Sequence, residues 1–179
     1  MTPDERIDLI SSSIKDVPDF PRSGVIFKDI TPLLASPAAY RAAVEALVHL
    51  APPDVDVVVG MEARGFMFAG PVALSLGVGF VPVRKPGKLP RDVYSETFDL
   101  EYGQDTLTVH QDAIQPGARV FVVDDVLATG GTIGATAKLI QYLGADLVSV
   151  GVLLELTALG GREHLSNMGI TDVSAVLTA

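Results

Sequence analysis

Two adjacent carboxylates followed by a turn of small residues have the clearest chemical potential in this chain. Asp124 and Asp125 end an apolar run, and the residues after Val126 and Leu127 are Ala128, Thr129, Gly130, Gly131 and Thr132. Carboxylates accept hydrogen bonds from vicinal hydroxyls. A glycine turn that opens a helix presents backbone N–H groups and the positive end of the helix dipole to a phosphate. A phosphorylated sugar could bind both the carboxylate pair, through its hydroxyls, and the glycine turn, through its phosphate.

The order of these parts excludes two common nucleotide-binding motifs. A P-loop requires G-x-x-x-x-G-K-[ST], and no Lys follows Gly131. A dinucleotide fingerprint requires G-x-G-x-x-G with an acid about 20 residues later, whereas the acids here precede the turn. A plain strand-to-helix turn with capping threonines remains an alternative, but it leaves the acid pair unexplained.

A basic segment in an acidic chain is the second chemical feature. The 179 residues carry 13 Lys and Arg against 22 Asp and Glu, a net charge of −9, yet residues 63–91 contain no acid. The cations of this segment are Arg64, Arg84, Lys85, Lys88 and Arg91. Such a segment favours a compact polyanion such as pyrophosphate, with a solvated loop as the alternative. The acidic remainder argues against a nucleic-acid surface.

The elements that must position these residues alternate between strand and helix. Apolar β-branched runs predict strands at 55–59, 78–83, 120–123, 147–154 and 173–177, and helical spacing predicts helices at 66–76 and 133–143. Pro71 must lie in a first turn or at a kink of the former helix. The alternation indicates βαβ units and an α/β fold, a mainly parallel sheet flanked by helices. Ligands then bind at the carboxyl edge of the sheet.

The remaining segments complete the predicted organisation. One helix follows the Thr2–Glu5 capping box, and another opens at Ser36–Pro37 and stops at Pro52–Pro53. Residues 94–110 break the strand–helix alternation, and two alternating stretches predict an antiparallel hairpin that projects as a flexible lid. No linker divides the chain, so we predict a single domain spanning residues 1–179.

Composition narrows the class of protein further. The chain is 48% hydrophobic and 20% charged and has no cysteine, as expected of an ordinary globular domain without disulfides or thiolate chemistry. Residues 1–16 lack the apolar stretch of a signal peptide, and no apolar run approaches the length of a membrane span. We therefore predict a cytoplasmic protein. Histidines 49, 110 and 164 have no metal-binding spacing.

Five ordered motifs between about Asp19 and Arg162 resemble the type I phosphoribosyltransferases, and among them the adenine phosphoribosyltransferases. Besides residues 120–132, they are E-A-R-G-F at 62–66, V-R-K-P-G-K-L-P at 83–90, L-E-Y-G at 100–103 and D-F-P…G-V-I-F-K-D-I at 19–30. The resemblance implies the type I fold with a hairpin lid. It also implies transfer of a 5-phosphoribosyl group from 5-phosphoribosyl 1-pyrophosphate to adenine, giving AMP and pyrophosphate in purine salvage.

The resemblance also implies site residues. Asp124 and Asp125 would bind the ribose hydroxyls and residues 128–132 the phosphate. Pyrophosphate would be bound by Glu62, Ala63, Arg64, Gly65, Lys85 and Lys88, and adenine by Ile26, Phe27, Lys28 and Val126. Glu101 would be the acid–base group at the purine, and Tyr102 would help the lid cover the site. Many relatives have Leu at position 126 and Arg at position 28, and the family often has a cis peptide at Glu62–Ala63.

The resemblance also implies a cofactor and a partner. Mg²⁺ would be held mainly by the substrate, with Asp124 and Asp125 acting indirectly and no protein group binding it directly. A homodimer is implied, with residues 84–90 near the partner's site. Two alternatives stay open: the same fold acting on another 6-substituted purine, and a regulator that senses 5-phosphoribosyl 1-pyrophosphate. A regulator would usually need a basic face or an added DNA-binding helix pair and could dispense with the lid and Glu101. This chain lacks the first and keeps the second, which favours the enzyme.

Overall fold

The computed structural model describes residues 2–100 and 103–179, and the chain divides into two compact units, Met1–Ala46 and Leu47–Ala179. The single-domain organisation stays a prediction. Among the described residues, no helix has both the length and the apolar composition that a membrane span requires.

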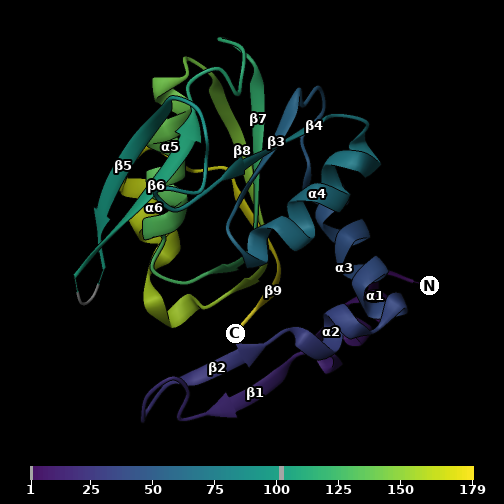
Figure 1. Ribbon diagram of the computed structural model, residues 1–179. Helices are drawn as coiled ribbons and strands as arrows, with labels where there is room; N and C mark the ends of the chain where they lie inside the picture. The colour runs from purple at the N-terminus through teal and green to yellow at the C-terminus, as the bar shows by residue number, and fades with distance from the viewer. Residues whose placement is uncertain (1, 101–102) are drawn as a thin grey trace. The chain divides into compact units, whose positions relative to one another are not determined.

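The first unit combines helices with a two-stranded hairpin (Figure 1). α1 (Pro3–Ser12) begins with the predicted capping box, in which the Glu5 N–H donates to Thr2 Oγ1 and the Thr2 N–H to Glu5 Oε2. β1 (Lys15–Pro18) pairs antiparallel with β2 (Ile26–Asp29), and α2 (Thr31–Ala35) follows. The hairpin and α2 were not predicted. α3 (Pro37–Leu50) opens where predicted and runs across the boundary of the units.

The second unit contains the predicted parallel sheet. Its five strands are ordered β4-β3-β7-β8-β9, and every neighbouring pair is parallel. The strands are β3 (Val57–Met61), β4 (Gly79–Val83), β7 (Arg119–Leu127), β8 (Asp146–Glu155) and β9 (Val173–Thr178). The inner strands are buried on both faces, as their continuous apolar runs predict.

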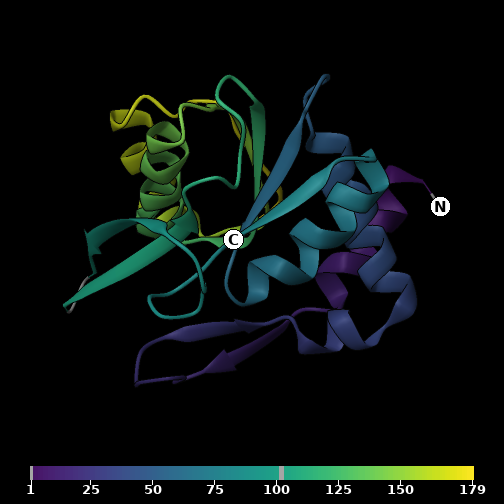
Figure 2. The same cartoon turned by 45° about the horizontal axis from the view of Figure 1, so that its top comes forward.

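Helices cover both faces of this sheet. α4 (Arg64–Leu76) contacts β3, β4 and β7, and α5 (Gly131–Tyr142) contacts β7 and β8; the two helices lie on opposite sides (Figure 2). α4 continues through Pro71 and ends at Gly77, which has the left-handed φ of 72° that favours glycine. A short 3₁₀ turn (Thr157–Leu159) and α6 (Gly161–Asn167) connect β8 to β9.

Residues 94–110 form the predicted hairpin. β5 (Val93–Asp99) pairs in continuous antiparallel register with β6 (Gln104–His110). The hairpin is fixed to the second unit, because Leu107 and Val109 belong to its core and Arg84 exchanges backbone hydrogen bonds with Thr108. Flexibility of the hairpin stays a prediction.

The largest differences from the predicted boundaries lie mostly beside the carboxyl edge of the sheet. The strand expected at 55–59 is Val57–Met61, and the strand expected to end at 123 continues to Leu127. The helices expected from 66 and from 133 start at Arg64 and at Gly131. The two strand ends share one origin, because hydrophobic periodicity fades where strands end in polar and small residues while backbone pairing with a neighbouring strand continues.

Candidate active site

The sheet has a topological switch point between β3 and β7. The connection through α4 leads from β3 to β4 on one side, and the connection through α5 leads from β7 to β8 on the other. Pairing between β3 and β7 ends at Gly60 and Val123, whereas β7 continues beside β8 to Leu127. In open α/β sheets, ligands bind in the crevice that this divergence creates at the carboxyl edge.

The acid pair lies in this crevice, beyond the last residue of β7 that pairs with β3. Asp124 is 8% exposed and Asp125 is 5% exposed, and the Asp125 N–H donates a hydrogen bond to Asp124 Oδ1 at 2.9 Å. Arg64 at the start of α4 has its Nε 2.8 Å from Asp125 Oδ2. The structure therefore brings together three of the four residues predicted to be catalytic.

Burial sets the electrostatics of this pair. It raises the pKa of Asp124 well above its ordinary value, and the negative charge of Asp125 adds to the rise, while the Arg64 guanidinium opposes it. An ionised Asp124 is therefore costly in the free protein. A ligand that donates hydroxyl hydrogen bonds or carries positive charge would relieve this cost.

The first turn of α4 approaches the acid pair closely. A Cβ at Gly65 would lie 2.7 Å from Asp124 Oδ1, so a larger residue would displace the carboxylate. The Glu62–Ala63 peptide is cis, as the resemblance implies. Within the described part of the chain, no side chain caps α4 at its N-cap residue Ala63. The positive end of the α4 dipole therefore lies beside the acid pair, where it favours an anion.

The turn between β7 and α5 offers a second helix N-terminus. Gly130 is the N-cap and has a φ of 85°, a conformation that glycine adopts without strain. Its carbonyl accepts the first intrahelical hydrogen bond, from Gly134 N–H at 2.8 Å. No side chain in residues 2–100 or 103–179 caps this helix either, so N–H groups at residues 131–133 can bind a phosphate.

One cavity of about 240 Å³ joins these parts. Its lining residues are Met61, Glu62, Ala63, Arg64, Gly65, Asp124, Asp125, Val126, Ala128 and Thr132. Two uncapped helix ends and a carboxylate pair thus surround a single space. This arrangement suits a ligand whose hydroxyls lie between two phosphate-bearing positions.

The acid pair could support a divalent cation through water or through substrate oxygens. Across the described residues, no group of three or more His, Cys, Asp or Glu side chains is arranged to hold a metal. Two buried carboxylates facing a cavity fit Mg²⁺, which prefers hard oxygens and keeps waters or substrate oxygens as its other ligands.

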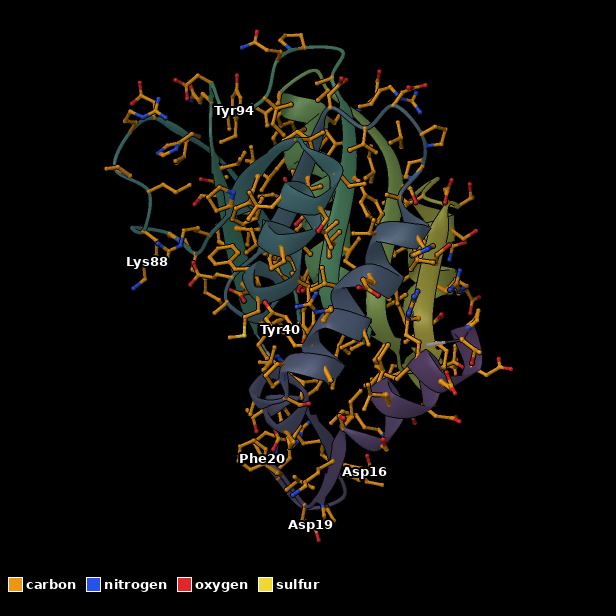
Figure 3. All side chains as sticks on the ribbon, turned by 90° about the vertical axis from the view of Figure 1, so that its right-hand side faces the viewer. Asp16, Asp19, Phe20, Tyr40, Lys88 and Tyr94 are labelled. Atoms are coloured by element: carbon orange, nitrogen blue, oxygen red, sulfur yellow. The ribbon has the colours of Figure 1, made fainter. Side chains whose placement is uncertain are left out.

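The basic segment is only partly brought to this cavity. Glu62 Oε2 accepts hydrogen bonds from Arg84 Nε at 3.0 Å and from the Lys85 N–H at 2.8 Å. Lys85 Nζ is paired with Asp105 of β6 at 2.5 Å. Lys88 is exposed, and its side chain points away from the ribbon (Figure 3). Neither lysine lines the cavity among the described residues. Of the residues predicted to bind pyrophosphate, only Glu62, Ala63, Arg64 and Gly65 therefore line it.

The residues predicted to contact adenine are divided between the units: β2 of the first unit carries Ile26, Phe27 and Lys28, and β7 of the second carries Val126. The Phe27 ring packs edge-on against Phe20, with 5.1 Å between centroids, and Phe20 lies near the tip of the β1–β2 hairpin (Figure 3). Lys28 Nζ lies 2.7 Å from an Asp16 carboxylate oxygen. Glu101 and Tyr102 lie outside the described residues.

α6 supports the turn between β7 and α5, a contact that sequence reasoning missed. A Cβ at Gly161 would lie 2.3 Å from the Ala128 carbonyl oxygen, and a Cβ at Gly130 would lie 2.9 Å from the Gly161 carbonyl oxygen. The two backbones therefore pack directly on one another. The Gly160–Gly161 doublet after β8 was the available signal, because paired glycines often mark close backbone approach.

Comparison with known proteins agrees with this geometry. Residues 30–171 match the family model of the phosphoribosyl transferase domain. The adenine phosphoribosyltransferase of Cutibacterium acnes is 71% identical over 173 residues, covering 97% of this chain and 98% of that protein.

Solved structures of similar proteins have the same fold. The crystal structure of adenine phosphoribosyltransferase from Thermoanaerobacter pseudethanolicus superposes with a TM-score of 0.92 at 46% identity, covering 97% of this chain and 99% of that one. The enzyme from Saccharomyces cerevisiae, complexed with an imino-altritol bisphosphate and adenine, gives a TM-score of 0.91 at 36% identity over 97% and 99% of the chains. The chain belongs to the phosphoribosyl transferase family and, within it, to the adenine phosphoribosyltransferases.

Proposed function

We propose that this chain transfers the 5-phosphoribosyl group of 5-phosphoribosyl 1-pyrophosphate to adenine, giving AMP and pyrophosphate in purine salvage. One observation carries the proposal: two uncapped helix N-termini and a buried carboxylate pair surround a single cavity at the switch point of the sheet. The substrate has the same order of groups, with ribose hydroxyls between a 5-phosphate and a 1-pyrophosphate. The name of the Cutibacterium acnes relative and the adenine in the yeast complex support the choice of base.

The reaction breaks the bond between ribose C1 and the pyrophosphate, so positive charge develops on the sugar and negative charge on the leaving group. The N–H groups of residues 131–133 bind the 5-phosphate. Asp124 and Asp125 accept hydrogen bonds from the ribose hydroxyls, and their negative charge stabilises the sugar cation. Arg64 and the first turn of α4 stabilise the departing pyrophosphate.

Mg²⁺ is the cofactor of this proposal, held mainly by substrate oxygens. When bound, it neutralises negative charge on the pyrophosphate. Asp124 and Asp125 support it indirectly, through the ribose hydroxyls or water.

Adenine recognition remains as the resemblance implies. Phe27 stacks on the base, Val126 closes the opposite face, and backbone groups of Ile26 and Lys28 read its edge. Glu101 is the acid–base group at the purine, and Tyr102 helps to cover the site. We also propose a cytoplasmic location.

The decisive experiment is AMP formation from adenine, 5-phosphoribosyl 1-pyrophosphate and Mg²⁺, with hypoxanthine, guanine and xanthine in parallel. Turnover with adenine alone supports the proposal. Turnover with another purine would overturn the base assignment. Tight binding of both substrates without turnover would favour the regulator instead. The variant Glu101→Gln tests the acid–base role separately.

The Lys85–Asp105 pair yields a first prediction. Both side chains are partly exposed, and pairs of this kind contribute little stability, about 0–1 kcal/mol. Asp105→Asn should release Lys85 for the pyrophosphate and lower the KM for 5-phosphoribosyl 1-pyrophosphate about two- to fourfold at low ionic strength. Steady-state kinetics at several salt concentrations checks this, because the difference should vanish as salt screens Lys85. Asp112→Asn is the control, since Asp112 pairs with Arg91 instead.

The homodimer that the resemblance implies is also part of this proposal, and it yields a second prediction. Leu74 of α4 is 83% exposed and Met67, two turns earlier on the same face, is 40% exposed. An apolar helix face of this kind suits a contact with a second copy of the chain. Leu74→Glu should shift the protein from dimer to monomer in analytical ultracentrifugation, whereas Ser75→Glu on the neighbouring face should not. A dimer that survives Leu74→Glu would assign the interface elsewhere.

A further inference from the structure

The hairpin strand β5 presents one side chain face to α5. Burial alternates along the strand: Tyr94, Glu96 and Phe98 are partly buried, whereas Ser95 and Thr97 are exposed. This period of two means that the three partly buried residues share a face. β5 contacts α5, so this face packs against that helix.

Two of these residues fix the strand to the C-terminal half of α5. Glu96 accepts hydrogen bonds from Lys138 Nζ at 2.7 Å and from the Tyr142 hydroxyl at 2.6 Å. The rings of Tyr94 and Tyr142 meet edge-on, with centroids 6.0 Å apart. The two hydrogen bonds also lower the pKa of Glu96, so its carboxylate remains ionised at neutral pH.

Phe98 reaches the opposite end of the helix. A Cβ at Gly131, the first residue of α5, would lie 3.1 Å from Phe98 Cδ2 and 3.3 Å from Cε2. The absence of a side chain at position 131 therefore lets the ring lie against the first turn. Phe98 and Gly131 also line a cavity of about 440 Å³ together with Thr129 and His164, so water has access to this side of the turn where the ring does not cover it.

We propose that Phe98 is a positioning residue for the 5-phosphate: its ring holds the first turn of α5 in the phosphate-binding conformation and shields the N–H groups there from water. This rests on the function proposed above. A covered N–H group binds an anion more strongly, because water neither competes for it nor screens the charge. The hairpin thus contributes Phe98 to the ribose-phosphate site, in addition to the residues of β7 and α5.

Phe98→Ala and Tyr94→Ala form a matched pair for the test. Both remove an aromatic ring from the same strand face, but only Phe98 meets the phosphate-binding turn. Phe98→Ala should raise the KM for 5-phosphoribosyl 1-pyrophosphate and the Kd of ribose 5-phosphate about tenfold, leaving kcat and the KM for adenine within about twofold. Tyr94→Ala should lower the melting temperature without these shifts, and Phe98→Leu should restore most of the affinity.

A double-mutant cycle tests the contact itself. Gly131→Ala forces a methyl group against the ring and should weaken ribose 5-phosphate binding, but it should add little in the Phe98→Ala background. Additive effects would overturn the proposal, and so would equal shifts in Phe98→Ala and Tyr94→Ala, or an unchanged Kd in Phe98→Ala. Because ribose 5-phosphate binding is measured by calorimetry without adenine, a failure of the proposed transfer reaction is seen separately in the wild-type assay.

Discussion

Asp124→Asn is expected to abolish most of the turnover and, at the same time, to raise the melting temperature. The activity should fall about 10²- to 10³-fold in kcat, because an amide cannot supply the negative charge that stabilises the developing sugar cation. The stability should rise because burial makes ionisation of the Asp124 carboxyl group unfavourable, and an amide removes that cost from the folded protein. Asparagine keeps the shape and can still accept the Asp125 N–H hydrogen bond.

The sign of the stability change depends on pH. Burial raises the folded-state pKa of Asp124 above the ordinary value of 3.8, so the folded state binds the proton more tightly than the unfolded state does. Stability of the wild type is therefore lost as pH rises from about 4 through the folded pKa. The melting temperature of Asp124→Asn should exceed that of the wild type little at pH 4 and more at pH 8, by about 2–4 °C per kcal/mol gained.

Calorimetric melting across that pH range, together with steady-state kinetics, checks both parts. Asp125→Asn is the contrasting variant, because it leaves the guanidinium of Arg64 without the carboxylate at 2.8 Å. It should lose turnover without the gain in stability. If Asp124→Asn is inactive but less stable than the wild type at pH 8, the protein must stabilise the ionised Asp124 carboxylate without ligand. Its pKa would then not be raised.

The parts of the site that are local in sequence could be predicted. The apolar run before Asp124 identifies a buried strand, and the Gly130–Gly131 turn identifies the start of a helix, because each pattern lies within about ten residues. The parallel sheet follows from the alternation of such units. The closeness of Arg64 and Asp125 does not follow from these local patterns, because it depends on β3 and β7 being neighbours in the sheet.

The parts that depend on contacts between distant segments could not be predicted. Phe98 resembles any strand aromatic until its ring meets Gly131, 33 positions later in the numbering. The pairing of Lys85 with Asp105 depends on β6 lying beside the loop after β4. Periodicity describes which residues of an element are buried, but not which element covers them.

Gly161→Ala is expected to weaken phosphate binding severely, although residue 161 lies outside the cavity-lining set. The added Cβ would lie 2.3 Å from the Ala128 carbonyl oxygen and 2.8 Å from Leu127 Cδ1. Backbone cannot rotate away as a flexible side chain can, so either α6 or the turn at 128–132 must move. The KM for 5-phosphoribosyl 1-pyrophosphate should rise about 30- to 100-fold, since misplacement by about 1 Å is enough for such a loss.

The matched control is Gly79→Ala, because a Cβ at Gly79 would have no atom within 4 Å and Gly79 lies at the exposed start of β4. Its kinetics and melting temperature should stay close to those of the wild type. Ribose 5-phosphate titrations followed by ³¹P NMR measure the phosphate site directly, and adenine KM reports on the rest of the site. If Gly161→Ala keeps the wild-type phosphate affinity, α6 can shift without moving the turn. The Ala128–Gly161 contact would then have no role in positioning it.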